Sequence, residues 1–505
     1  MQGISLKHPF ILLRNRHLLK VTFALVFWYS NPISAQVQPV PRYNRIRYHV
    51  YHWQTFHTKT FSVYFPAGAD SLGAYISKQV PDALEAIKKR TLQTLSKSPN
   101  IIIYPSTDQV YESNIGSALP RQYTLPTFVY KGTRLLLTYR GSYSDLKEQL
   151  YEALSRSIWD EQFREGDLED QARGGSEEQI PMWFKEGTIR YFANGWPVQA
   201  EDALRTSFEK KHFTTWQEVT NYEPRLAGQA FCYYLDDNFY KQATMQLFSQ
   251  LKKKKSLARA IRLIAKRTLD TLQNQCFTFY YNRFETEAKE KTKIAANKTI
   301  VFPHKKGIIS NITISPDKEH IAYTSLYYQK RTVYVYDIKN KGTDKISTYT
   351  LPPWISDHAP DIYPLIQWRS DGKLLYTVLP VKGKMTIRAY TLNGNLLETV
   401  KLYRVDGVTA IIPLSDQQFM LSAYRKGESD LVKYEDAKER YTPYTNDSYD
   451  DMEPDVTKGG NIVFVSNRPK EIKQKAWKIG VGYDPDTLWQ GIKGALGNQP
   501  YCPCQ

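Results

Sequence analysis

The stretch Ile180–Trp196 has the sequence IPMWFKEGTIRYFANGW and predicts a helix with a glycine in its interior. Pro181 suits the first turn of a helix, and Gly195 suits the position just past its end. Gly187 lies between them and costs a helix roughly 1 kcal/mol relative to alanine. That cost makes sense if a second helix packs closely at this point. We therefore expect a helix over residues 181–193 with a tightly packed neighbour.

A second amphipathic helix is predicted upstream, over residues 144–162. One apolar stripe runs along it, formed by Leu146, Leu150, Ala153, Leu154 and Ile158, as expected for a helix with one buried face. Asp145 and Glu148 supply acidic side chains to its first turn, where the helix dipole favours them.

Three kinds of sequence pattern follow one another along the chain. From residue 42 to about residue 142, predicted strands (FSVYFP, NIIIYP and RLLLTY) surround one helical pattern over residues 71–95. Helical periodicity then dominates up to residue 292, and short β-runs separated by turn residues begin near residue 300. We predict a multidomain α+β protein, with a small α/β unit, a helical region and then all-β repeats over residues 300–470.

The β-rich part repeats one pattern, an apolar strand, a polar turn and a second apolar strand. Four such units occupy residues 309–325, 363–378, 408–424 and 452–469. Asp317, Asp371 and Asp416 mark equivalent turns and are separated by 54 and 45 residues. This spacing is typical of the four-stranded blades of a β-propeller, which bury their faces only against neighbouring blades.

These units resemble the repeats of TolB-like and dipeptidyl-peptidase-type propellers. The segments YTNDSYDDMEPDV (residues 444–456) and IVFVSNRP (residues 462–469) carry that resemblance most strongly. Propellers of this type usually close with about six or more blades, so four units predict an incomplete propeller, from a truncated reading frame or as a short partial sheet. Residues 471–505 have no blade pattern and are expected to form an irregular tail.

Residues 45–285 resemble the gluzincin-like peptidases, whose third zinc ligand lies on a helix with the pattern P-x-W-[FL]-x-E-G-x-x-x-Y. Residues 181–191 fit that pattern and place Glu186 at the ligand position. Further similar segments are FHTKTFSVYFP, IIIYPSTDQVYESNIG, GSYSDLKEQLYEAL and LAGQAFCYYLDDNFY. The resemblance implies that the preceding helix would carry H-E-x-x-H, with two zinc-binding imidazoles one turn apart.

Alignment on SYSDL places residues 147–151, with the sequence KEQLY, on that motif. Lysine offers no lone pair while protonated, and a tyrosine phenol has a reference pKa of roughly 10, so neither Lys147 nor Tyr151 is an ordinary zinc ligand. Lys147, Glu148, Tyr151 and Glu186 are then vestigial positions of an inactivated domain spanning residues 42–292, and Lys147 is expected to pair with Glu186. This reading predicts no catalytic residue, no metal and no cofactor.

Two alternative interpretations of the sequence include a bound metal. Glu148 and Glu186 could belong to a metallopeptidase or other hydrolase with an unusual ligand set. His49, His52 and His57 also lie close together in sequence, although an extended segment would place His49 and His52 on opposite faces.

Residues 1–35 have the order of a secretory signal, with a basic start, an apolar run over residues 21–29 and small residues before Ala35. We expect cleavage after Ala35, and no other stretch approaches the length needed to span a membrane. The protein is then exported to the periplasm or associated with the outer membrane. Cys232 and Cys276 could form a disulfide there, whereas Cys502 and Cys504 fall in the expected loose terminus.

The formal net charge is +17, with a local run of four lysines at residues 252–255. An exported protein meets anionic lipid and glycan surfaces before nucleic acid, so we expect no nucleic-acid partner, and a contact with an anionic surface stays open. The resemblance to TolB-like propellers and to an inactivated peptidase domain implies a non-catalytic cell-envelope protein that binds envelope proteins, for example as an accessory of envelope transport. A glycan- or lipid-binding role is a further alternative, suggested by the basic, tyrosine-rich composition.

Overall fold

The computed structural model describes residues 49–106, 109–110, 128–130, 133–164, 180–254, 256–290, 307–327, 330–350, 363–447, 449–457, 460–468 and 490–492. Residues from Ile46 onward belong to one compact unit. The predicted signal, Cys502, Cys504 and nearly all of the predicted tail lie outside the described residues. Within them, no helix has both the length and the apolar character needed to span a membrane.

A five-stranded mixed sheet begins this unit, with the strand order β1-β2-β3-β5-β4. Its strands are β1 (Trp53–His57), β2 (Ser62–Pro66), β3 (Asn100–Tyr104), β4 (Phe128–Tyr130) and β5 (Arg134–Thr138). The three central strands β2, β3 and β5 are parallel, and the edge strands β1 and β4 are antiparallel to their neighbours. The strands predicted from FSVYFP, NIIIYP and RLLLTY are therefore confirmed.

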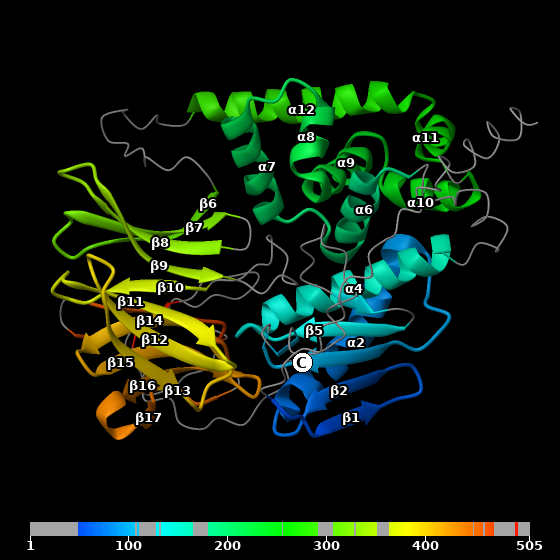
Figure 1. Cartoon of the computed structure of the whole chain (residues 1–505). Coiled ribbons are helices and arrows are strands. Elements are labelled where there is room, and N and C mark those ends of the chain that lie inside the picture. The colour runs from blue at the N-terminus through cyan, green and yellow to red at the C-terminus, as the bar shows by residue number, and fades with distance from the viewer. Residues whose placement is uncertain are drawn as a thin grey trace, which may run out of the picture. The chain divides into compact units, whose positions relative to one another are not determined.

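Two long helices, α2 (Asp70–Thr91) and α4 (Tyr143–Arg164), pack on one face of this sheet (Figure 1). The predicted stripe of α4 lies in the resulting core together with Val63, Ile101 and Leu135 of the sheet. Both helices match their predicted positions to within a few residues because their apolar residues recur at the helical period.

The helical region contains α6 (Met182–Asn194), α7 (Val198–Lys211), α8 (Trp216–Tyr222), α9 (Pro224–Asn238), α10 (Ala243–Lys254), α11 (Leu257–Ala265) and α12 (Leu269–Glu290). The close neighbour expected at Gly187 is α9, because a Cβ atom at Gly187 would lie 2.2 Å from the backbone of Gly228. Cys232 and Cys276 lie buried in the core of this region as free thiols. The optional disulfide between them is therefore absent from the structure.

The rest of the chain forms consecutive antiparallel sheets that resemble propeller blades. The first contains β6 (Ile308–Ile314), β7 (His320–Tyr327), β8 (Lys330–Asp337) and β9 (Thr343–Thr350). The second contains β10 (Leu365–Trp368), β11 (Leu374–Val381), β12 (Lys384–Thr391) and β13 (Leu396–Leu402). The third contains β14 (Gly407–Ser415), β15 (Gln418–Arg425), β16 (Glu428–Glu435), the 3₁₀ helix η4 (Asp436–Lys438) and β17 (Arg440–Pro443).

A further sheet joins β18 (Asp451–Val456), β19 (Ile462–Ser466) and β20 (Gln490–Ile492). Strands in all four sheets pair in sequence order, and apolar side chains fill the space between neighbouring sheets. Asp317, Asp371 and Asp416 each lie in the turn between the first two strands of a sheet. The repeat predicted from their spacing is confirmed for the first three units, which are complete four-stranded sheets.

The turn between β15 and β16 reaches the N-terminal sheet and its helices. Tyr424 packs in the core formed by α2, α4 and the sheet, and Tyr143 at the start of α4 donates a hydrogen bond to the carbonyl oxygen of Gly427. Asp450 accepts hydrogen bonds from the Tyr139 hydroxyl (3.2 Å) and the Tyr143 backbone (2.8 Å). The two parts that the sequence divides near residue 300 therefore share buried contacts.

Candidate functional site

Helix α6 carries Glu186 into the protein interior, where only 3% of the residue is exposed. The glycine contact with α9 fixes one side of α6. At its C-terminal end, the Arg90 guanidinium donates hydrogen bonds to the carbonyl oxygens of Phe192 and Ala193. These carbonyls would otherwise lack intrahelical partners. Glu186 is thus held at a fixed place opposite α4.

The partner of Glu186 is Arg156, on the middle of α4. Its guanidinium donates two hydrogen bonds to the carboxylate, from Nη1 to Oε1 at 2.8 Å and from Nη2 to Oε2 at 2.5 Å. Arg156 is itself only 7% exposed. Burial alone would raise the pKa of Glu186, but the hydrogen bonds and charge of Arg156 hold that pKa below its ordinary value. Both groups are therefore charged at neutral pH.

The predicted pairing of Lys147 with Glu186 is wrong. The Lys147 ammonium lies 5.8 Å from the centre of the Tyr151 ring. Tyr151 packs against the core that α4 shares with α2 and the sheet, and burial raises its pKa. Glu148 is exposed. None of these three vestigial positions meets Glu186.

The wrong prediction for Lys147 is explained by the directions in which side chains point around α4. Successive residues of an α-helix are rotated by about 100°, so Tyr151 points within about 20° of Ile158 on the apolar stripe. Arg156 points about 140° away from Tyr151, toward α6. The alignment on SYSDL placed the two ligand positions, Lys147 and Tyr151, on the side of α4 that faces α2. Glu148 lies close enough to Arg190 of α6 to interact with it.

The two α4 residues that are one turn apart and lie near Glu186 are Glu152 and Arg156. Glu152 is 4% exposed, lies 3.7 Å from the Arg156 guanidinium and accepts a hydrogen bond from Arg225 of α9. Arg190 of α6 is close enough to interact with both Glu152 and Arg225. The contact between α4, α6 and α9 is therefore an alternating network of acidic and basic groups.

This network does not fit a zinc ion. A guanidinium has donors in a planar fork and no lone pair, so Arg156 offers nothing to a metal. Ala153, next to Glu152, offers no side chain that could act as a base. Sequence reasoning missed Glu152, Arg156 and Arg225, although the face opposite the predicted stripe of α4 pointed to the first two.

The N-terminal histidines do not assemble a metal site in the described part of the chain. His49 and His52 precede β1, and Nδ1 of His57 lies 2.7 Å from the Ser62 hydroxyl. Two other groups of potential ligand side chains come together there, one on the β6–β7 turn (Asp317, Glu319 and His320) and one buried in the β-sheets (Asp430, Asp447 and Asp451). In the first group, Asp317 accepts hydrogen bonds from Ser315 and the Glu319 backbone and so closes the turn.

The second group is paired with a buried arginine. Arg468 donates hydrogen bonds to both oxygens of Asp451 and to Asp447. Burial, followed by the nearby charge of Asp451, raises the pKa of Asp430 to about 8. Burial also raises the pKa of Asp450 to about 7, despite the hydrogen bonds it accepts from Tyr143 and Tyr139. Burial therefore favours the protonated, uncharged form of Asp430 and of Asp450.

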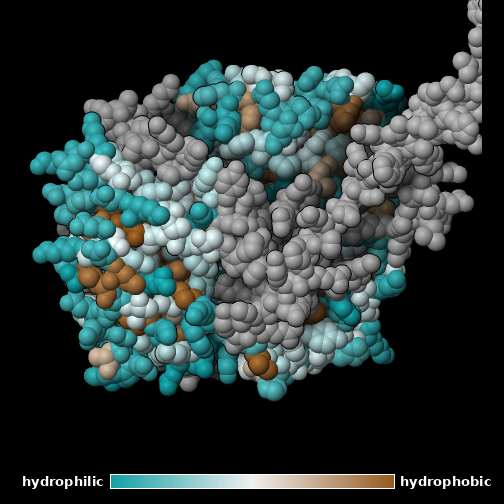
Figure 2. Space-filling view, viewed as in Figure 1, coloured by the Kyte–Doolittle hydropathy of each residue, from teal (hydrophilic) through white to brown (hydrophobic). Residues whose placement is uncertain are grey.

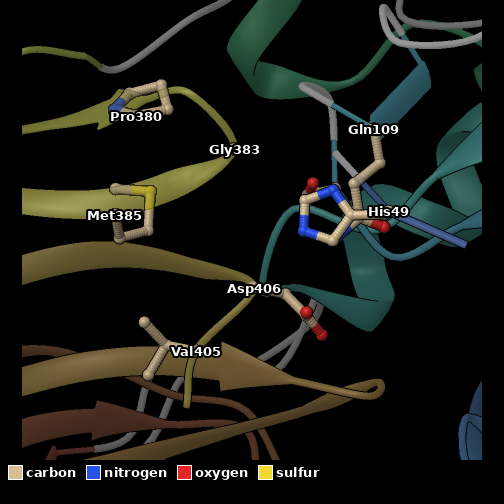
Figure 3. A pocket seen from close by; sticks show the side chains of 8 residues that line it. His49, Gln109, Pro380, Gly383, Met385, Val405 and Asp406 are labelled. Carbon is tan, nitrogen blue, oxygen red and sulfur yellow. The ribbon is translucent and has the colours of Figure 1, made fainter. Parts of the chain in front are cut away.

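A small, open pocket lies beside the β11–β12 turn, where Gly383 and Met385 line it (Figure 3). His49 and Gln109 line it from the N-terminal side, and Asp406 lines it from the β-sheets. The Gln109 side chain accepts a hydrogen bond from Tyr51, and Asp406 accepts one from the Lys426 backbone at 2.7 Å. Its polar groups thus serve contacts within the chain.

No family model matches this sequence, and no curated protein matches it. Among solved structures, TolB from Acinetobacter baumannii is 17% identical over 37% of this chain and 44% of that chain, with a TM-score of 0.28. An acylaminoacyl peptidase from Pyrococcus horikoshii is 17% identical over 31% of this chain and 28% of that chain, with a TM-score of 0.23.

The β-propeller domain of the trilobed protease from Pyrococcus furiosus is 13% identical over 38% of this chain and 56% of that chain, with a TM-score of 0.25. These distant matches cover about a third of this chain and less than two thirds of each of the other chains. None of them supports a gluzincin-like domain. At these identities and TM-scores, the likeness establishes neither an activity nor a binding partner.

Proposed function

We propose that residues 42–292 are a metal-free relative of the gluzincin-like peptidases and that the chain works as a non-catalytic binding protein. One observation carries this proposal, the pair of hydrogen bonds between Arg156 and Glu186 in the interior. The guanidinium takes the carboxylate that the family would offer to zinc. An active site of that class needs two imidazoles one turn apart on the preceding helix.

The spacing of α4 residues supports this interpretation. Glu152 and Arg156 lie one turn apart and near Glu186, as the two histidines of H-E-x-x-H would. Ala153 would then hold the position of the general base. Here an ion pair replaces the metal, and it links α4 to α6 much as a metal would link them.

In this proposal the blade-like sheets form the binding surface. Their loops would bind an envelope protein, as the loops of TolB-like and dipeptidyl-peptidase-type propellers do. With the secretory signal expected at residues 1–35, this makes the chain an exported accessory of envelope transport, in the periplasm or at the outer membrane. Crosslinking and pull-down from envelope fractions would test the partner. The alternative hydrolase around Glu148 and Glu186 is less favoured, because Glu148 is exposed and Arg156 holds Glu186.

The zinc-binding register can be tested by rebuilding the site. The variant Glu152→His/Arg156→His should offer two imidazoles and the Glu186 carboxylate, and its zinc affinity should exceed that of the unmodified protein by orders of magnitude. Missing supporting hydrogen bonds could reduce the gain about 10- to 100-fold without removing it. Isothermal titration calorimetry of the folded proteins would measure the affinities.

The matched control is Lys147→His/Tyr151→His, which adds the same two side chains on the face toward α2 and should gain no comparable zinc affinity. Zinc binding by this control and not by the rebuilt variant would refute the proposed register. Stoichiometric zinc in the unmodified protein, lost on Glu186→Ala, would refute the non-catalytic function itself.

A further inference from the structure

One surface of the helical region carries uncompensated positive charge. Residues 241–269 contain nine lysines and arginines and no aspartate or glutamate. This segment forms α10 and α11, which lie next to each other near one end of α12 (Figure 1). A run of this length with a single sign of charge differs from the mixed charge of most helical surfaces.

The fold directs these cations outward. Leu247, Phe248 and Leu251 of α10, with Leu257 and Ile261 of α11, are buried in the core. The opposite sides of the two helices then face solvent, with six exposed cations that we call the basic α10–α11 surface: Lys252, Lys253, Lys254, Arg259, Arg262 and Lys266. Figure 2 shows the helical region as mostly hydrophilic with small hydrophobic spots among the polar residues.

Carboxylates do not neutralise this surface within the part of the chain that the structure describes. Lys252 donates a hydrogen bond to the amide oxygen of Gln162, which carries no charge. The neighbouring helices behave differently, because Arg205 of α7 pairs with Glu287 and Arg283 of α12 pairs with Glu201. The positive potential is therefore concentrated on α10 and α11.

Helix α11 adds an apolar side chain to the charges. Arg259, Arg262, Leu263 and Lys266 are spaced as i, i+3, i+4 and i+7, so they share its outer face. Leu263 is 52% exposed among these three cations. An aliphatic side chain surrounded by lysine and arginine is the arrangement with which amphipathic helices bind the interface of an anionic membrane.

We propose that the basic α10–α11 surface docks on an anionic lipid bilayer, with its cations on the head-group phosphates and Leu263 at the acyl boundary. This inference does not depend on the proposed function of the chain. A lipid surface fits better than a soluble polyanion because Leu263 would gain from an apolar phase and would gain nothing from a sugar or phosphate chain.

The test is co-sedimentation of the full mature chain with vesicles of phosphatidylcholine, with and without phosphatidylglycerol. The protein should bind only the anionic vesicles, and less at high salt. Each cation near such a surface contributes about fivefold in partitioning, so Lys253→Gln/Arg259→Gln/Arg262→Gln should weaken binding about a hundredfold. All three side chains are exposed, so the fold should persist, which circular dichroism would check.

The matched control is Lys339→Gln/Lys345→Gln/Lys401→Gln, which removes the same charge from exposed positions on the sheets and should bind like the unmodified protein. Leu263→Ser should weaken binding several-fold at high salt as well as low, because it removes an apolar contribution. Equal binding to neutral and anionic vesicles would overturn the proposal. So would an equal loss in the control variant, or binding to a soluble polyanion such as heparin without binding to vesicles.

Discussion

The ion pair between Arg156 and Glu186 allows a sharp test of how α4 and α6 are held together. Arg156→Met keeps a long side chain but removes the cation, leaving Glu186 charged at a place where only 3% of it is exposed. Breaking a buried pair in this way costs about 3–5 kcal/mol, because the remaining charge loses its hydrogen-bonded partner. The charges of Arg225 and Lys185 nearby should keep the cost toward the lower end of that range. Two short hydrogen bonds are lost as well. We expect a loss of that size in the stability of the α4–α6 contact.

Removing both partners should cost much less. In Arg156→Met/Glu186→Leu, apolar side chains of similar volume fill the space, and such replacements are often neutral or stabilising. Glu152 keeps Arg225 as a partner in both variants. The double-mutant cycle should therefore give a coupling energy of several kcal/mol between Arg156 and Glu186.

Native-state hydrogen exchange of α4 and α6 is the suitable assay, because a chain with several cores need not unfold in one step. Arg156→Met should reduce protection in both helices, and the double variant should restore it. If the two substitutions were additive, or Arg156→Met changed protection by less than about 1 kcal/mol, the buried-pair reasoning would be refuted.

The pair also has a pH signature of definite sign. Arg156 holds the pKa of Glu186 below its ordinary value, so its contribution to stability is present above the unfolded pKa and is lost as the pH falls through the folded pKa. The difference between the unmodified protein and Arg156→Met should shrink in acid.

Two further predictions concern other buried positions. Because burial raises the pKa of Asp450 from 3.8 to about 7, the contribution of this carboxyl is fully present below pH 3.8 and is lost as the pH rises toward 7, by about 1.4 kcal/mol per pH unit. Denaturant unfolding of Asp450→Asn should lack this component, and an unchanged pH profile would contradict it. Gly187→Ala should destabilise the protein, because its Cβ would lie 2.2 Å from Gly228 and overpacking of about 1–3 kcal/mol outweighs the roughly 1 kcal/mol gain in helix propensity. Gly342→Ala, with nothing within 4 Å, should leave the thermal midpoint unchanged, and equal shifts for the two variants would count against the close packing of α6 and α9.

The sequence alone determined the features that depend on local periodicity. The stripe from Leu146 to Ile158 fixed which side of α4 is buried against the sheet, since residues at the helical period share a face. Gly187 predicted a close helix neighbour, because close packing is the usual reason for a glycine that destabilises a helix interior relative to alanine. The turns at Asp317, Asp371 and Asp416 fixed the repeat, because each blade-like unit repeats the same local strand and turn pattern.

The tertiary structure decided which distant side chains meet. Arg156 rather than Lys147 reaches Glu186 because the rotation of α4 is set by its whole apolar face. A motif aligned five residues earlier points about 140° away. Asp450 meets Tyr139 and Tyr143 across about 300 residues of chain, a contact without any local pattern. Neither the Arg156–Glu186 ion pair nor the hydrogen bonds to Asp450 have a periodic sequence pattern, since the partners come together only when separate parts of the fold pack.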